Sequence, residues 1–267
     1  MPSSRPVGVF DSGIGGLTVA HEIMRQLPTE SIVYFGDTAR VPYGPKSPDT
    51  VCRYSREIGA FLQDQDVKAI VIACNTATAH ALPMLRDELP IPVIGVVEPG
   101  ARAAVRASGG GHIGVIGTTG TVRSGAYERA IRALEPDAVI TVRACPLFVP
   151  LVEEGWIDHP VTRQIAQEYL EPLVRQKIAA LVLGCTHYPL LKSLLCRMLG
   201  PGVALIDSAA ETAAEIGRVL RERDLEAPTD IAPSHRFVAS DDPLQFLQLG
   251  QRFLGNAIEG VEVHTFI

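Results

Sequence analysis

Residues 69–76 read Ala-Ile-Val-Ile-Ala-Cys-Asn-Thr, and residues 180–187 read Ala-Leu-Val-Leu-Gly-Cys-Thr-His. Each is a short apolar run that ends in a cysteine and continues into polar side chains. Such a run is typical of a buried parallel strand, whose last residue reaches the sheet edge where α/β proteins place their sites. We therefore expect Cys74 and Cys185 at two strand ends, and two such thiols in one crevice would flank a substrate.

Outward from these stretches, strand-like and helix-like segments alternate along the chain. This alternation predicts an α/β fold with mostly parallel, doubly wound sheets. The predicted strands are 7–10, 31–35, 69–73, 92–96, 113–116, 139–144, 180–184 and 203–206, and the predicted helices are 17–26, 47–63, 76–88, 127–134, 161–175, 190–199 and 211–223.

The second half of the series resembles the first. Residue 7 aligns with 113 and residue 69 with 180, offsets of 106 and 111 residues. These similar offsets favour an internal duplication. The alternative is that strands of parallel sheets resemble one another without any repeat.

The expected domains are 1–97 together with 207–267, and 98–206. A linker is expected near 98–111, because this stretch ends in the run Ser108-Gly-Gly-Gly111. Beyond the helix at 211–223, we expect the chain to pack back on the first domain.

The composition indicates a folded protein and argues against nucleic-acid-binding, secreted and membrane-spanning proteins. The 267 residues are 46% apolar and 20% charged, which suits a folded chain with a large core. A net charge of −6 argues against non-specific nucleic-acid binding. Residues 1–6 carry no apolar signal segment, and no apolar run reaches the roughly 18 residues of a membrane helix. The five cysteines are scattered and form no CxxC pair. This pattern, together with the lack of an apolar signal segment, predicts a cytoplasmic protein with reduced thiols.

The residues after both cysteines favour helix starts. Asn75, Thr76 and Thr78 are cap-type residues after Cys74, and Thr186 with Pro189 suits a helix start after Cys185. A helix N-terminus lowers a thiol pKa from about 8.5 and offers amides to a carboxylate. The alternative for any cysteine is a small buried apolar residue, which we expect for Cys52, Cys145 and Cys196.

Other polar residues stand near the predicted strand ends. Asp11 opens a glycine turn, Asp11-Ser12-Gly13-Ile14-Gly15-Gly16, that could expose amides to an anion, although Asp11 could equally cap a helix. Asp37 ends the second strand and could orient a group there. Tyr43, in the rigid loop Pro42-Tyr43-Gly44-Pro45, could cover a ligand.

Two further candidates belong to the second half of the chain. His187 could hold a proton beside Cys185, and Glu153 lies in a predicted turn where a carboxylate is usually solvated. Cys185-Thr-His187 contains two zinc-ligand types, but a metal site needs three or four ligands with recognisable spacing. No metal site is therefore expected.

Together these motifs resemble the glutamate racemase family. The resemblance rests on Val9-Phe-Asp-Ser-Gly-Ile-Gly-Gly-Leu-Thr-Val19, Pro42-Tyr-Gly44, Ala73-Cys-Asn-Thr-Ala77, Pro146-Leu-Phe-Val-Pro150 with Glu153, and Gly184-Cys-Thr-His-Tyr-Pro189. It runs from about Val7 to Glu215 and includes Asp207-Ser208.

The resemblance implies two pseudo-symmetric α/β domains with the active site in the cleft between them. It also implies cofactor-independent interconversion of L- and D-glutamate, which supplies D-glutamate for peptidoglycan. It implies that Cys74 removes the α-proton of D-glutamate and Cys185 that of L-glutamate. Assistance is implied from Asp11 near Cys74, and from Glu153 and His187 near Cys185. The implied substrate contacts are Asp11, Ser12, Tyr43, Gly44, Asn75, Thr76, Thr186 and His187, with Asp37 in support. A homodimer with no nucleic-acid, membrane or cofactor partner is also implied.

Three alternatives remain open at this point. A racemase of the same superfamily acting on aspartate or another amino acid would keep both cysteines and differ in its side-chain contacts. A non-catalytic amino-acid-binding protein would need no paired thiols. A pyridoxal-dependent racemase would need a Schiff-base lysine, and Lys46, Lys68, Lys177 and Lys192 have no evident site context.

Overall fold

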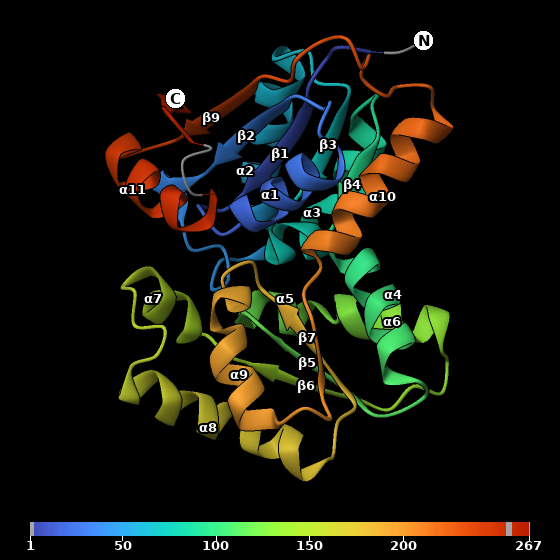
Figure 1. The fold of residues 1–267 in the computed structure, drawn as a ribbon, viewed down its shortest axis with the longest axis vertical. Coiled ribbons are helices and arrows are strands. Elements are labelled where there is room, and N and C mark those ends of the chain that lie inside the picture. The colour runs from blue at the N-terminus through green and yellow to red at the C-terminus, as the bar shows by residue number, and fades with distance from the viewer. Residues whose placement is uncertain (1–2, 255–257, 267) are drawn as a thin grey trace. The chain divides into compact units, whose positions relative to one another are not determined.

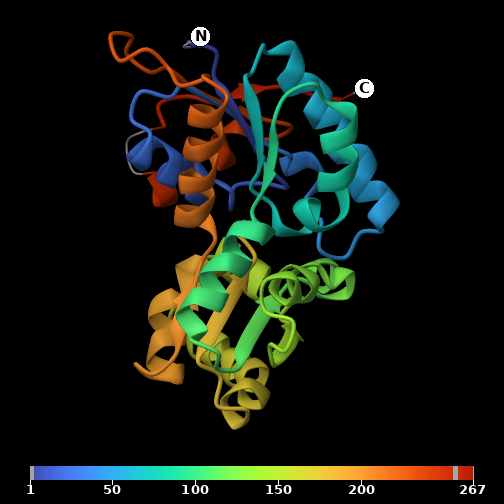
Figure 2. The same cartoon turned by 90° about the vertical axis from the view of Figure 1, so that its right-hand side faces the viewer.

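The computed structural model describes residues 3–254 and 258–266. The chain folds into two compact units, residues 1–96 with 209–267 (unit 1) and residues 97–208 (unit 2) (Figures 1 and 2). The sequence-based boundaries fall at 97/98 and 206/207, in the first turn of one helix and just before another.

Unit 1 is built on a parallel sheet. In the described part of the chain this sheet has six strands in the order β10-β9-β2-β1-β3-β4, and neighbouring strands run parallel. Apolar, largely β-branched residues fill its central strands, as expected of strands covered on both faces. The strands are β1 (Val7–Asp11), β2 (Ile32–Gly36), β3 (Ala69–Ile72), β4 (Val93–Gly95), β9 (His235–Ala239) and β10 (Glu262–Val263).

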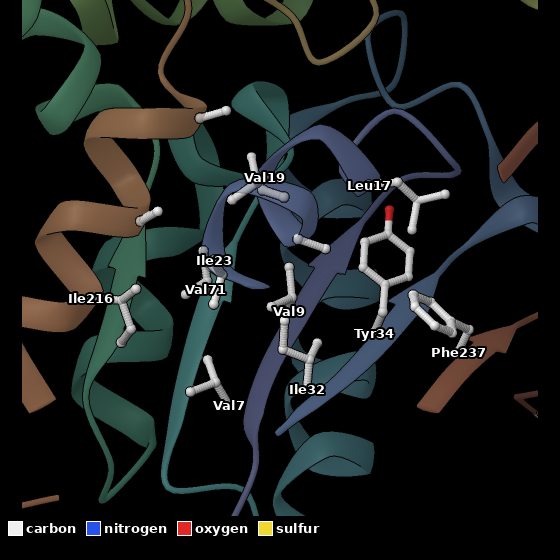
Figure 3. Packing of buried hydrophobic residues seen from close by; sticks show 14 of the residues in the cluster. Val7, Val9, Leu17, Val19, Ile23, Ile32, Tyr34, Val71, Ile216 and Phe237 are labelled. Atoms are coloured by element: carbon white, nitrogen blue, oxygen red, sulfur yellow. The ribbon is translucent and has the colours of Figure 1, made fainter. Parts of the chain in front are cut away.

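Alternate residues of this sheet pack against helices on opposite faces. Val7 and Val9 point toward α1, α10 and α11, whereas Phe10 joins the core against α2 and α3. Figure 3 shows the first of these cores, in which Ile23 of α1 lies near Val71 and Leu17 of α1 lies near the Tyr34 ring. The segments are α1 (Leu17–Gln26), η1 (Thr38–Arg40), α2 (Pro48–Asp64), α3 (Asn75–Glu88), α10 (Ala209–Glu222) and α11 (Pro243–Leu254).

Unit 2 repeats the plan with fewer elements. Its described residues form a four-stranded parallel sheet in the order β6-β5-β7-β8, with α7, α8 and α9 on one face and α4 and α6 on the other. The elements are α4 (Val97–Ser108), β5 (Ile113–Gly117), α5 (Thr119–Ser124), α6 (Ala126–Leu134), β6 (Ile140–Ala144), α7 (Phe148–Glu153), α8 (Pro160–Arg175), β7 (Ala180–Gly184), η2 (Tyr188–Leu191), α9 (Lys192–Leu199) and β8 (Ala204–Ile206).

The strand orders of the two units correspond. The order β2-β1-β3-β4 in unit 1 matches β6-β5-β7-β8 in unit 2. The register matches as well, since Val7 pairs with Ala69 and Ile113 pairs with Ala180. The predicted fold class, two pseudo-symmetric parallel α/β units, is therefore confirmed.

The expected linker at 98–111 is wrong, because most of it is the helix α4. Alanines favour helix in this stretch, and the buried Val97, Ala101 and Ala104 pack on the sheet of unit 2. The helix ends at Ser108, where Gly109 and Gly110 adopt φ values of 54° and 81° that suit glycine. The glycine run is thus a helix terminator rather than the end of an extended connection.

The C-terminal residues return to unit 1, where β9 extends the sheet beside β2 and α11 covers one face. The sequence predicted neither element. No helix among the described residues is both long enough and apolar enough to cross a bilayer.

Candidate active site

Cys74 lies two residues after the end of β3, at the start of α3. Its side chain is 5% exposed. It is itself the N-cap of α3, and its Sγ accepts a hydrogen bond from the backbone N–H of Ala77 at 3.4 Å. The expectation that a following hydroxyl or amide residue caps this helix is wrong, because the helix begins at Asn75. An N–H aimed at the sulfur at the positive end of a helix stabilises a thiolate.

Ser12 lies beside this thiol, and Asp11 precedes Ser12 at the end of β1. The Cys74 thiol donates to Ser12 Oγ across 3.7 Å, and Gly13 N donates to Asp11 Oδ2 at 3.0 Å. Asp11 is fully buried at the end of β1 and does not cap α1, whose N-cap is Gly16. We call Asp11, Ser12 and Cys74 the Cys74 cluster.

Gly16 allows the glycine turn to fold back on the strand ends. A Cβ at this position would stand 2.5 Å from Asp11 Cβ and 2.8 Å from the Tyr34 hydroxyl. That hydroxyl donates to the carbonyl of Gly13 at 2.9 Å. Burial raises the pKa of Tyr34, and the nearby Asp11 and Cys74 raise it further, so the hydroxyl stays protonated as a donor.

The loop after β2 carries Tyr43 and Gly44, both buried. The Tyr43 ring packs 5.7 Å from that of Tyr54, and its hydroxyl donates to the buried Asp37 carboxylate. Because the ring and hydroxyl are engaged in this way, the part of Tyr43 left to meet a ligand is its backbone. Asn75 and Thr76, in the first turn of α3, are buried as well.

Cys185 occupies the equivalent place in unit 2, directly after β7. The expected α-helix start with Thr186 as its cap is wrong, since the chain forms the 3₁₀ turn η2 with His187 at its N-cap. The N–H of Tyr188 donates to the carbonyl of Cys185 at 3.1 Å, which is the i to i−3 bond of a 3₁₀ turn rather than an α-helical bond.

Polar side chains surround the Cys185 sulfur. His187 Nδ1 lies 3.9 Å from Cys185 Sγ, and His187 Nε2 lies 3.0 Å from Glu153 Oε1. Glu153 ends the helix α7 and is not in the solvated turn that the sequence predicted. Thr186, which stands between Cys185 and His187 in the sequence, is buried as well. We call Cys185, His187 and Glu153 the Cys185 cluster.

The imidazole of this cluster is strongly basic. Burial lowers the pKa of His187, but its hydrogen bonds and charge interactions with Cys185 and Glu153 outweigh burial and raise the pKa to about 10. At neutral pH the ring is therefore an imidazolium that faces a sulfur on one side and a carboxylate on the other.

The other cysteines differ from one another. Cys145 is fully buried, and burial raises its pKa to about 12, as suits a core residue. Cys52 is half-buried and Cys196 is exposed on α9, so the expectation of a buried Cys196 is wrong. An α9 residue on the side away from the sheet needs no apolar partner.

Neither a metal site nor a Schiff-base lysine is evident at the strand ends. Within residues 3–254 and 258–266, no group of three or more His, Cys, Asp or Glu is placed to hold a metal ion. Lys68 is fully buried at the amino end of β3 in an ion pair with Glu30, and Lys192 pairs with Asp207.

Comparison with known proteins decides the family. Residues 12–216 match the family described as Asp/Glu/Hydantoin racemase. A glutamate racemase from Geobacter metallireducens is 52% identical over 257 residues, which cover 96% of this chain and 95% of that relative. The chain belongs to the glutamate racemase family. It is accordingly an enzyme of the isomerase class.

Solved structures of this family agree in fold. Glutamate racemase isoform RacE1 of Bacillus anthracis has a TM-score of 0.93 and 43% identity, with 98% of this chain and 97% of that chain covered. Glutamate racemase of Francisella tularensis, solved in complex with D-glutamate, has a TM-score of 0.92 and 39% identity, with 98% of each chain covered.

Sequence reasoning missed several residues that hold the site. In the sequence, Tyr34 is indistinguishable from the other apolar residues of its strand. In the structure its hydroxyl donates to the glycine turn and supports it. Arg40 and Ser240 bond to Asp37, and Ser240 is separated from it by 203 residues of sequence. No local pattern signals a contact of that range.

Proposed function

We propose that this protein interconverts L- and D-glutamate without a cofactor, using Cys74 and Cys185 as the two bases. The observation that carries the proposal is the equivalence of the two thiols. Each is buried within two residues of the end of the matching strand of its unit, β3 or β7, and each has polar partners of its own. The family relationship and the D-glutamate bound to the Francisella tularensis relative support glutamate as the substrate.

Two bases are proposed because racemisation inverts the configuration of the α-carbon. Inverting a carbon means removing a proton from one face and adding a proton to the other. A single base tends to return the proton to the face from which it came. One cysteine acts as a thiolate that accepts the α-proton, and the other as a thiol that donates one. The roles exchange with the direction of reaction, so no net proton is consumed.

Each thiol acts on one enantiomer. Cys74 removes the α-proton of D-glutamate, and Cys185 removes that of L-glutamate. Asp11 lies at the end of β1 within the Cys74 cluster, where a carboxylate can relay a proton. The imidazolium of His187 stabilises the Cys185 thiolate, and Glu153 holds that imidazolium in its charged form.

The remaining site residues bind the substrate. The α-proton of an amino acid is very weakly acidic, so the carbanion requires donors placed in advance and exclusion of water. Backbone amides of the glycine turn and of Tyr43 and Gly44 suit the carboxylates. The buried Asn75, Thr76 and Thr186 add hydroxyl and amide groups beside the two sulfurs.

The biological setting follows from the same proposal. D-Glutamate made by this reaction enters peptidoglycan, and so serves cell-wall biogenesis and cell shape. A cytoplasmic location agrees with five cysteines that are all free. Homodimerisation is proposed from the family resemblance, and sedimentation of the purified protein tests it.

Incubation of each enantiomer in D₂O tests the proposed reaction. Purified, reduced protein with no added cofactor is expected to produce both enantiomers from either one, with deuterium at the α position. Chiral chromatography and mass spectrometry measure the two outcomes. Folded protein that leaves both enantiomers unexchanged would exclude the racemase function, and faster turnover of aspartate than of glutamate would favour the aspartate alternative.

Cysteine variants test the two-base assignment. Cys74→Ala and Cys185→Ala are each expected to abolish interconversion, because one face of the substrate then lacks its proton carrier. Cys196→Ala is the matched control, since that thiol is exposed on α9. Near-full activity in either of the first two variants would show the assignment to be wrong.

A further inference from the structure

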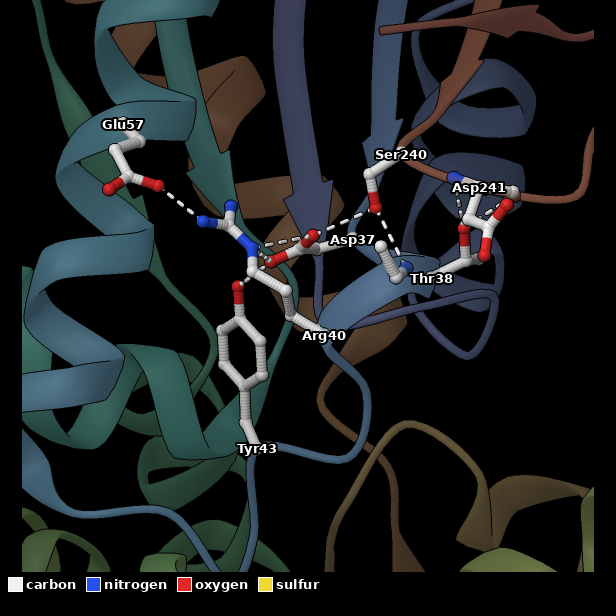
Figure 4. Close-up of polar contacts among 8 residues, drawn as sticks. Asp37, Thr38, Arg40, Tyr43, Glu57, Ser240 and Asp241 are labelled. Atoms are coloured by element: carbon white, nitrogen blue, oxygen red, sulfur yellow. Dashed lines mark hydrogen bonds and ion pairs between the residues drawn. The ribbon is translucent and has the colours of Figure 1, made fainter. Parts of the chain in front are cut away.

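A buried carboxylate organises the loop that follows β2. Asp37 is fully buried, and Arg40 Nε donates to its Oδ2 at 2.7 Å and its Oδ1 at 3.0 Å. The Tyr43 hydroxyl donates to Oδ2, and Ser240 Oγ donates to Oδ1 at 2.9 Å. Figure 4 shows these groups converging on Asp37 from two separate parts of the chain.

Ser240 is the contribution of the C-terminal segment. It follows β9, and its side chain is 5% exposed. Its Oγ both donates to Asp37 and accepts from the backbone N–H of Ala39 at 2.9 Å. The hydroxyl therefore both donates its one hydrogen to the loop after β2 and accepts a hydrogen bond from that loop.

The neighbouring residues reinforce the connection. Thr38 Oγ1 donates to the carbonyl of Asp241 at 2.6 Å, and Asp241 N donates back to Thr38 Oγ1 at 2.9 Å. Ser240 N donates to the carbonyl of Gly36 at 3.1 Å. Ser240 and Asp241, after the end of β9, are thereby bonded to residues 36–39, and of these two Ser240 is the one that reaches the Asp37 carboxylate.

The two other donors to Asp37 are anchored differently. Arg40 also pairs with Glu57 and stacks 4.0 Å over the Tyr54 ring, so its position does not depend on Ser240. Tyr43 has the Tyr54 ring contact and this one hydroxyl bond to a carboxylate that Ser240 helps to orient. Without the Ser240 donor, Oδ1 keeps only the bond from Arg40 Nε at 3.0 Å, so the carboxylate that accepts from Tyr43 is held less firmly.

We propose that Ser240 is a positioning residue for substrate binding, which acts through Asp37 to hold Tyr43 and Gly44 in place. This inference rests on the proposed function, in which the backbone of Tyr43 and Gly44 receives the substrate. Ser240 itself touches no reacting atom in this scheme. Its effect belongs in the binding of glutamate rather than in proton transfer at the two sulfurs.

Steady-state kinetics of Ser240→Ala test the proposal. A hydrogen bond to a charged group is among the stronger ones, so KM for glutamate is expected to rise on the order of tenfold. The change in kcat is expected to stay within about twofold, because the Cys74 and Cys185 clusters are untouched. Ser240→Thr keeps the hydroxyl and is expected to restore most of the lost KM. Ser234→Ala, an exposed serine just before the same strand, is the matched control.

Hydrogen exchange supplies a readout independent of turnover. Amides of residues 38–46 are expected to exchange faster in Ser240→Ala than in the unchanged protein or in Ser234→Ala. An unchanged KM together with unchanged exchange in this loop would overturn the proposal, as would equal losses in Ser240→Ala and Ser240→Thr. If the unchanged protein fails to racemise glutamate, the proposed function fails, and exchange in the loop alone then decides whether Ser240 positions Tyr43.

Discussion

The two cysteines are supported by different kinds of group. The Cys74 sulfur receives a backbone N–H from its own helix, a donor that does not titrate. The Cys185 sulfur faces His187, an ionisable group whose pKa is raised to about 10. A pH dependence that arises from an imidazolium partner therefore belongs to the Cys185 cluster, and Glu153 is one of the groups that sustain that charge.

His187→Asn is expected to lose stability in a pH-dependent way. The folded pKa of about 10 lies above the ordinary value of 6.5, so the charged ring stabilises the folded state. This contribution is fully present below pH 6.5 and is lost as pH rises through about 10. The gap in unfolding free energy between the unchanged protein and the variant should therefore be widest near pH 6 and shrink toward pH 10. Urea denaturation at several pH values measures it.

His21→Asn is the matched control for this titration, because His21 is exposed on α1. Its stability should run parallel to that of the unchanged protein across the same pH range. Glu153→Gln removes one of the groups that raise the pKa, so the gap should close at lower pH in that background. A gap that stays constant from pH 6 to pH 10 would contradict the charged state assigned to His187.

At the scale of elements, buried strands were the easiest to predict. The range predicted at 180–184 matches β7, because four to five apolar residues between polar ones leave little freedom in where a buried strand lies. The sequence did not predict helix α4, because a glycine run directly follows its alanines and such runs are typical of linkers as well as of helix ends. Strand β9 was missed because its partner β2 lies about two hundred residues earlier, beyond any local pattern.

Tyr34→Phe tests how strand β2 supports the glycine turn. The variant keeps the ring, which packs 6.3 Å from Phe237 and 6.0 Å from Phe246, and removes the bond to the carbonyl of Gly13. Leaving a buried carbonyl without this donor costs roughly 1–3 kcal/mol of stability. KM for glutamate is expected to rise as well, because the turn carries amides proposed to bind substrate.

Urea denaturation and steady-state kinetics on the same preparations measure the two effects of Tyr34→Phe. Tyr54→Phe, which keeps the ring stacked on Arg40, is the control and is expected to stay near the unchanged protein in both. If Tyr34→Phe loses stability while KM does not move, the hydroxyl serves the core of unit 1 and not the turn.

Across the whole chain, the repeated strand order explains why sequence reasoning reached the two cysteines. Residues 69–74 and 180–185 are equivalent in both sequence and register, so one pattern predicted both strand ends. The partners of each sulfur are not part of the repeat. His187 follows Cys185 closely, but Glu153 reaches it only through the fold of α7. Contacts such as that between Asp37 and Ser240 arise from topology and lie beyond any sequence pattern.

The edge of the unit 1 sheet opposite Cys74 depends on a buried ion pair. Lys68 Nζ lies 2.6 Å from Glu30 Oε2, and both side chains are nearly inaccessible. Lys68 Nζ also donates to the carbonyl of Ser3 at 2.8 Å, and Ala227 N donates to Glu30 Oε1 at 2.8 Å. The starts of β2 and β3 and two segments distant in sequence therefore meet at these charges.

Lys68→Met is expected to lower the free energy of unfolding by roughly 3–5 kcal/mol, because it leaves the Glu30 charge buried without its partner. The double variant Lys68→Met with Glu30→Leu should recover most of that loss, since an apolar pair of similar volume avoids the stranded charge. Arg5→Met breaks the exposed pair with Asp66 and should cost at most about 1 kcal/mol. Urea denaturation measures all three. If the double variant were as unstable as Lys68→Met alone, the loss would come from the bonds to Ser3 and Ala227, and the ion pair would not be the connection that holds this edge.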